Sequence, residues 1–208
     1  MMRLWAWGVA LLLLAAGPAA GQDWAKDKLK KSSRHGEWVK VKNGSREVQT
    51  WIVYPEVKDK ATAVVVIHEI FGLTDWVRLT ADEVAAAGYI AIAPDLLSGM
   101  GPGGGGTESL PGRDGVTRAV RDLPPEQVLA DLDAVVAHVA KLPACNGKVA
   151  VCGFCWGGGQ AFTYATHNPT IKAAFRSLRS VAKRKTWPPP QQNPQAATLP
   201  LHAGNFFT

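Results

Sequence analysis

The run of residues 61–68, Ala-Thr-Ala-Val-Val-Val-Ile-His, holds apolar side chains at consecutive positions instead of alternating ones. A strand of this kind is buried on both faces, as strands are in a parallel sheet that helices cover on both sides. Residues 89–93 form a second run of this type, which Pro94 ends. We therefore expect a sheet built around these two strands and enclosed by helices.

Segments with helical spacing alternate with the apolar runs. Residues 75–87 place Trp76, Thr80 and Val84 on one face, and Gly88 supplies a stop. Further helices are expected at residues 124–141 and 156–166, and further strands at residues 148–152 and 171–175. This alternation predicts an α/β protein with a mainly parallel sheet and helices on both faces.

Two other segments have recognisable turn or loop chemistry. Residues 37–41 and 47–53 are short β-type runs around Asn43-Gly44, a strong turn dipeptide, and they predict an antiparallel hairpin. Residues 96–123 contain four consecutive glycines and are too long for a plain connection. We expect them to form an irregular loop over the functional site.

The N-terminus differs from the rest of the chain. Arg3 precedes an apolar run of secretory length, and small residues follow it at positions 17–21. Residues 1–21 are therefore predicted to be a signal peptide, which implies a periplasmic or secreted protein without stable membrane association after cleavage. Residues 22–35 are polar and lysine-rich, and are expected to form a solvated lead-in.

Charge and composition set off the C-terminus. All 17 acidic residues precede Arg176, whereas residues 176–208 hold five prolines and five basic residues. We expect one domain at residues 36–175, followed by a basic, proline-rich and disordered tail at 176–208. Five of the six net positive charges lie in this tail, since the preceding residues hold 18 basic and 17 acidic side chains. The charge therefore does not indicate a folded nucleic-acid-binding surface, and no nucleic-acid partner is predicted.

The sharpest motif is Gly153-Phe154-Cys155-Trp156-Gly157, between a predicted strand and a predicted helix. It matches the G-x-nucleophile-x-G elbow, with cysteine in the serine position. The glycines remove Cβ atoms that would crowd the strained turn, and the helix start favours a thiolate. The pattern predicts a nucleophilic cysteine, although a small buried cysteine in a glycine-rich turn is the simpler alternative.

The cysteines allow a second interpretation. Cys152 and Cys155 form a C-x-x-C pair, which is found in thiol redox proteins. No second Cys/His pair stands at zinc spacing, so neither a metal nor a cofactor is predicted. The three cysteines, with Cys145, are an odd number, which fits a reactive thiol better than a disulfide scaffold.

A second motif, His68-Glu69-Ile70-Phe71-Gly72, follows the first apolar strand. An acyl-transfer site needs two N–H groups directed at the developing oxyanion. In a fold with this elbow, one comes from the residue after the nucleophile, here Trp156, and the other from the loop after an earlier strand, here Ile70. The plain alternative for Glu69 is an exposed loop acid.

Taken together, these segments resemble the dienelactone hydrolase family. The similarity covers residues 38–175 and rests on the joint presence of E-I-F-G and G-x-C-x-G-G. It implies an α/β-hydrolase that opens small esters or lactones through a cysteine acyl-enzyme. By resemblance Cys155 is the nucleophile, Glu69 contacts the resting thiol and helps to generate thiolate, and the amides of Ile70 and Trp156 form the oxyanion hole.

The sequence also departs from the family pattern. The family takes an aspartate and then a histidine from later loops, but no acidic residue follows Asp133. His202 stands in a poorly matching context, and His167 lies on the helix after the elbow. No arginine follows Asp95 where family members bind a substrate carboxylate.

We expect an incomplete domain without its C-terminal strands and with impaired activity. An adjacent reading frame across residues 176–179 can encode Val-Leu-Tyr-Gly, which would explain the break as a frameshift. A non-catalytic ligand-binding domain on a hydrolase scaffold stays open as an alternative function.

Overall fold

The computed structural model describes residues 23–177. The predicted signal peptide, His202 and the tail from residue 178 lie outside these residues. The strands are β1 (Gly36–Asn43), β2 (Arg46–Val53), β3 (Ala61–Ile67), β4 (Ile90–Pro94), β5 (Cys145–Phe154) and β6 (Ala174–Ser177). The helices are α1 (Asp23–Lys30), α2 (Asp75–Ala86), α3 (Gly112–Arg121), α4 (Pro125–Ala140) and α5 (Trp156–His167). No helix within residues 23–177 is long and apolar enough to cross a membrane.

The six strands form one sheet in the order β1-β2-β4-β3-β5-β6. Strands β4, β3, β5 and β6 run parallel to one another. Strands β1 and β2 form an antiparallel hairpin at one edge, and β2 pairs antiparallel with β4. The mainly parallel sheet is confirmed. The hairpin is confirmed as well, because Asn43 pairs with Arg46 across a turn in which Gly44 has a φ of 60°.

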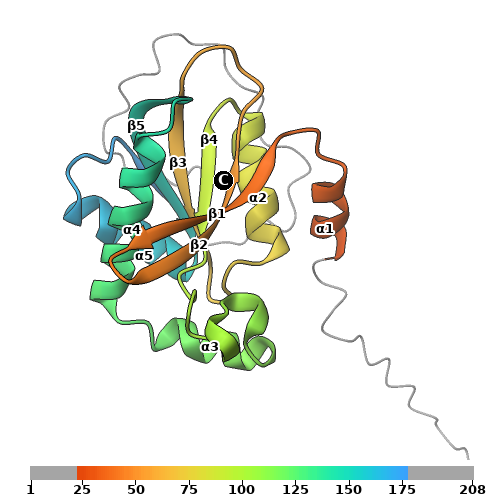
Figure 1. Cartoon of the computed structure of the whole chain (residues 1–208), viewed down its shortest axis with the longest axis vertical. Coiled ribbons are helices and arrows are strands. Elements are labelled where there is room, and N and C mark those ends of the chain that lie inside the picture. Colours follow the sequence, from red (N-terminus) through yellow and green to blue (C-terminus); the bar gives the residue numbers. More distant parts are fainter. Residues whose placement is uncertain (1–22, 178–208) are drawn as a thin grey trace, which may run out of the picture.

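Helices cover both faces of the sheet, as predicted (Figure 1). One face packs against α4 and α5 in a cluster that includes Leu132 and Tyr164. The other face packs against α2 and α1 in a second cluster that includes Val77 and Ala25. Strand β3 contributes Val65 to the first cluster and Val66 to the second. This explains why its apolar residues are consecutive.

Three segments differ from the predictions. Residues 22–35 are not only a solvated lead-in, because α1 buries Ala25, and Ser32 and Arg34 hydrogen-bond the buried Asp82 of α2. Residues 96–123 are not wholly irregular, because they contain α3. The last strand runs to Ser177, past the expected boundary at residue 175. The predicted absence of later strands concerns residues outside the described range.

A buried acid joins the hairpin to α4. Asp131 is fully buried and accepts hydrogen bonds from Asn43 Nδ2 at 2.8 Å and from Arg46 Nε at 3.0 Å. Removing one member of a buried pair leaves the other without its partner, which is strongly destabilising. This contact therefore stabilises the position of the hairpin against the rest of the domain.

Asp131→Ala is expected to lower the free energy of unfolding by about 2 to 4 kcal/mol, because Arg46 loses its ion-pair partner and Asn43 Nδ2 loses its acceptor at a partly buried site. Urea denaturation measures the loss. Glu47→Ala is the matched control, since the Lys40–Glu47 pair is exposed and such pairs contribute less than about 1 kcal/mol. Equal losses in the two variants would contradict the prediction.

Candidate active site

Cys155 lies at the junction between β5 and α5, where the motif placed it. Its φ is 52° and its ψ is −116°, and within residues 23–177 it is the only non-glycine residue with a positive φ. A non-glycine residue in such a conformation is strained, and strain of this kind gathers at functional sites. The residue is exposed. The turn therefore presents the thiol at the surface, directly before the first turn of α5.

The two glycines of the elbow are required by close backbone contacts. A Cβ atom on Gly153 would lie 2.1 Å from the carbonyl oxygen of Gly157. A Cβ atom on Gly157 would lie 2.2 Å from the carbonyl oxygen of His68. Both distances are far below van der Waals contact, so only glycine fits. The elbow is thus pressed directly against the end of β3.

Parallel pairing brings the two sequence motifs to one edge of the sheet. Ile67 of β3 pairs with Gly153 of β5, and Glu69 and Cys155 each stand two residues further along their chains. Glu69 is only 8% exposed. The alternative interpretation, in which Glu69 is an acid on an exposed loop, is therefore wrong. Within residues 23–177, neither the Cys155 thiol nor the Glu69 carboxyl forms a side-chain hydrogen bond.

The Glu69 carboxyl occupies a mixed electrostatic environment. Burial raises the pKa of Glu69, and the positive charge of Arg113 partly opposes this rise. Arg113 comes from the start of α3 and lies 3.8 Å from the centre of the Phe71 ring. The segment 96–123 therefore covers the motif loop, as predicted, but it does so with a helix.

His68 connects the two motifs through its ring. It is fully buried, stacks on Trp156 with ring centres 5.4 Å apart, and places Nδ1 2.8 Å from the carbonyl oxygen of Glu69. Burial lowers the pKa of His68, which keeps the ring neutral at neutral pH. A neutral ring that meets a carbonyl through Nδ1 carries its proton there. His68 is the first residue of the second sequence motif, but the motif predicted no role for it.

The other described histidine near α5 is far from the elbow. His167 Nε2 lies 3.3 Å from Asp133 Oδ2, at the opposite end of the 12-residue helix α5 from Cys155. At 1.5 Å of rise per residue the two positions are about 18 Å apart. His167 is thus unable to serve Cys155, as expected.

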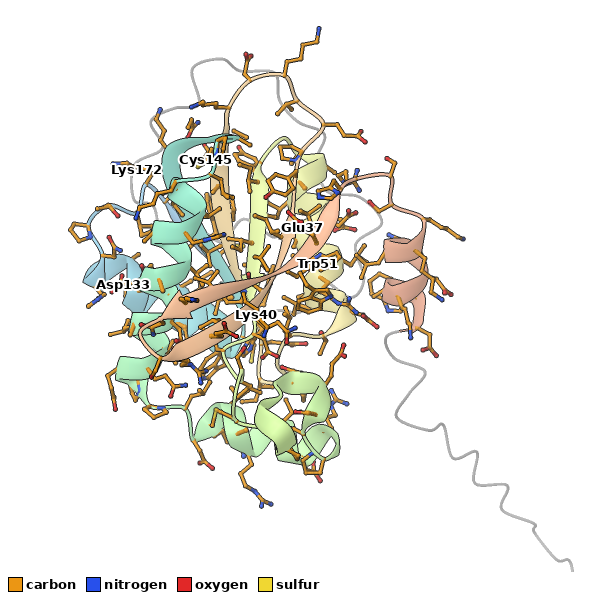
Figure 2. The ribbon with its side chains drawn as sticks, viewed as in Figure 1. Glu37, Lys40, Trp51, Asp133, Cys145 and Lys172 are labelled. Atoms are coloured by element: carbon orange, nitrogen blue, oxygen red, sulfur yellow. The ribbon has the colours of Figure 1, made fainter. Side chains whose placement is uncertain are left out.

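The remaining cysteines do not support a redox pair. All three thiols are free, and burial raises the pKa of Cys152 to about 12. Such a thiol holds almost no thiolate at neutral pH, and thiolate is the species that attacks disulfides. Cys145 lies at the start of β5, at the end of the sheet opposite α3 (Figure 2).

Replacing Glu69 should change how stability depends on pH. A carboxyl whose folded-state pKa is raised costs stability once pH rises through that pKa, and costs none while it is protonated in both states. Glu69→Gln is therefore expected to be more stable than the parent at pH 7.5, with the difference vanishing near pH 4. Chemical denaturation at both pH values measures this, with the exposed Glu108→Gln as control. A difference independent of pH would contradict the burial effect.

The sheet order, the helices on both faces and the cysteine elbow define an α/β-hydrolase. A sequence model of the dienelactone hydrolase family matches residues 48–200, well over half of the chain. The chain therefore belongs to the dienelactone hydrolase family. The match begins later than residue 38 and continues past residue 175, where the composition indicated a break.

Relatives and solved structures agree with this assignment. A "Putative carboxymethylenebutenolidase" of Escherichia coli K12 is 36% identical over 139 residues, covering 65% of this chain and 49% of that protein. "Carboxymethylenebutenolidase 1" of Cupriavidus pinatubonensis is 34% identical over 111 residues, covering 53% and 47%. The "Putative Dienelactone Hydrolase" structure from Klebsiella pneumoniae has a TM-score of 0.60 at 29% identity, covering 69% of this chain and 59% of that one. The chain spans about half the length of the curated relatives it matches.

Proposed function

We propose that the chain is a hydrolase of small esters or lactones that works through an acyl-enzyme on Cys155. The observation that carries this proposal is the exposed thiol on a strained backbone turn, held between two glycines that admit no side chain. Membership of the dienelactone hydrolase family and relatives named carboxymethylenebutenolidase support the substrate class.

In the proposed reaction the Cys155 thiolate attacks the carbonyl carbon and forms a C–S bond. The carbonyl oxygen becomes an oxyanion, which the backbone N–H groups of Ile70 and Trp156 would stabilise. The C–O bond then breaks, and the alkoxide leaves with a proton as an alcohol. In a lactone the alcohol stays attached to the acyl group. Water later attacks the thioester and releases the acid and the thiol.

Formation of the thiolate is assigned to the surroundings of Cys155. The thiol precedes the first N–H groups of α5, and the helix dipole favours an anion there. Glu69 stands at the same edge of the sheet, with a pKa raised by burial. A carboxylate that gains from protonation can accept the proton of the thiol, which is the role that the family resemblance gives to this residue.

Hydrolysis of the thioester needs an activated water. Within residues 23–177 no histidine or carboxylate hydrogen-bonds the Cys155 thiol, and His167 lies at the far end of α5. The loss of a general base typically lowers a rate by about 10² to 10⁴. We therefore propose that acylation outpaces deacylation in this chain.

Pre-steady-state kinetics with p-nitrophenyl acetate test the proposal. We expect a burst of about one nitrophenolate per chain, followed by a much slower steady phase. A ligand-binding domain without chemistry would give no burst. Rapid multiple turnover that His202→Ala abolishes would contradict the proposed lack of a base, and it would assign that role to His202.

A further inference from the structure

Asp95 is a buried acid that takes no part in the proposed reaction. It directly follows β4 and is 6% exposed. Its carboxylate accepts the N–H of Leu97 at 3.1 Å, the N–H of Thr107 at 2.7 Å and the hydroxyl of Thr107 at 2.7 Å. Two of these three hydrogen bonds come from Thr107, which is itself only 8% exposed.

The Thr107 hydroxyl has a fixed orientation. A carboxylate only accepts hydrogen bonds, so the hydroxyl proton points to Asp95. The hydroxyl oxygen then accepts the backbone N–H of Leu73 at 3.0 Å. The hydrogen bonds from Leu73 to Thr107 and from Thr107 to Asp95 therefore link the loop that follows β3 to the end of β4.

Leu73 directly follows the turn that carries Ile70. The turn closes through the Gly72 N–H and the Glu69 carbonyl at 3.1 Å. Gly72 has a φ of 72°, and a Cβ atom there would lie 2.4 Å from Thr107 Oγ1. On the other side, a Cβ atom on Gly106 would lie 2.2 Å from Asp95 Oδ2. The threonine is thus held tightly between the turn and the acid.

We propose that Asp95 and Thr107 are positioning residues for acyl transfer. They act through the turn from Glu69 to Gly72, whose Ile70 N–H must point at the developing oxyanion. This inference rests on the proposed function. An oxyanion donor works because its direction is set before the reaction begins, and losing one such donor costs about 10² to 10³ in rate. A turn that shifts by a fraction of an ångström should cost part of that amount.

Thr107→Val tests the proposal because valine keeps the shape and removes the hydroxyl. We expect the acylation rate constant of the nitrophenyl acetate burst to fall by about 10- to 100-fold. The ester concentration at half-maximal burst rate should change little, because the ground state does not use the oxyanion donors. Thr107→Ser restores the hydroxyl and should return the rate constant to within about threefold.

Thr80→Val is the matched control. Thr80 is also 8% exposed, but its hydroxyl bonds the Trp76 carbonyl within α2, at 2.9 Å. It should lose stability without a comparable loss of acylation rate. Equal rate losses in the Thr107→Val and Thr80→Val variants would overturn the proposal, as would an unchanged rate in Thr107→Val or a loss that serine does not restore.

Two further results separate the possible failures. If Thr107→Val does not fold, Asp95→Asn replaces it. The carboxylate accepts the Thr107 N–H on Oδ2 and the Thr107 hydroxyl on Oδ1, whereas an amide has a single acceptor oxygen and can keep only one of these bonds. A fall in the acylation rate constant is therefore expected again. An unchanged rate in a folded Asp95→Asn would overturn the positioning role. If the parent chain gives no Cys155-dependent burst, the proposed function fails first.

Discussion

Gly157→Ala is expected to destabilise the domain by at least about 3 kcal/mol, or to prevent folding. The added Cβ atom would lie 2.2 Å from the carbonyl oxygen of His68 and 2.5 Å from that of Ile67. Both atoms belong to backbone at the end of the central strand β3, so neither can move aside without disturbing the sheet. Gly153→Ala should behave in the same way.

The matched control lies two residues away on the same helix. A Cβ atom on Gly159 would meet nothing within 4 Å, and alanine is the better helix former by up to about 1 kcal/mol. Gly159→Ala is therefore expected to be neutral or stabilising. Urea denaturation compares the variants, and similar stability for Gly157→Ala and Gly159→Ala would show that the elbow does not press on β3 as described.

Cys155→Ala is expected to lower the rate of nitrophenolate release in the burst phase by about 10³-fold or more, because it removes the atom that forms the acyl bond. Cys155→Ser should also lose the burst, since a serine hydroxyl is a much weaker acid than a thiol, so the helix dipole and Glu69 are not enough to activate it. Stopped-flow absorbance measures the burst amplitude and rate.

Cys145→Ala and Cys152→Ala are the controls for this experiment. Cys145 is buried at the start of β5, and Cys152 has a pKa raised to about 12. Both variants should keep the burst. A burst that disappears in Cys145→Ala and persists in Cys155→Ala would show that Cys145 is the reactive thiol, and it would contradict the prediction.

The parts of the fold that sequence predicted are those with strong local signals. Consecutive β-branched residues in β3, the Asn43-Gly44 turn and the glycines around Cys155 each predict a local backbone structure, and the structure confirms all three placements. The buried Val128, Leu132, Val135 and Val139 likewise follow from helical spacing alone.

The elements that we did not predict from the sequence depend on contacts between residues that are distant in the chain. Helix α1 is short and mostly polar, and its order depends on packing against α2 and on the bonds from Ser32 and Arg34 to Asp82. Helix α3 buries only Val116 and Val120, too few to show a clear period. Such elements have little local signal, so tertiary contacts decide them.

The same reason applies within the candidate site. Nothing in the residues around Asp95 or in the four consecutive glycines before Thr107 indicates that Asp95 and Thr107 meet, because their contact exists only when both loops are folded. The position of Arg113 over Phe71 is equally non-local. The family resemblance, not the spacing of the motifs, predicted that Glu69 lies near Cys155, and the parallel pairing of Ile67 with Gly153 places both residues just beyond the same edge of the sheet.

The most direct test of the central claim is to locate the acyl group. The chain is mixed with p-nitrophenyl acetate, quenched in acid during the burst, digested and analysed by mass spectrometry. We predict one acetyl group per chain, about stoichiometric, on the peptide that contains Cys155, and none on that peptide in Cys155→Ala. Acetylation confined to lysines or to Cys145, with Cys155 unmodified, would contradict the assignment of Cys155 as the nucleophile.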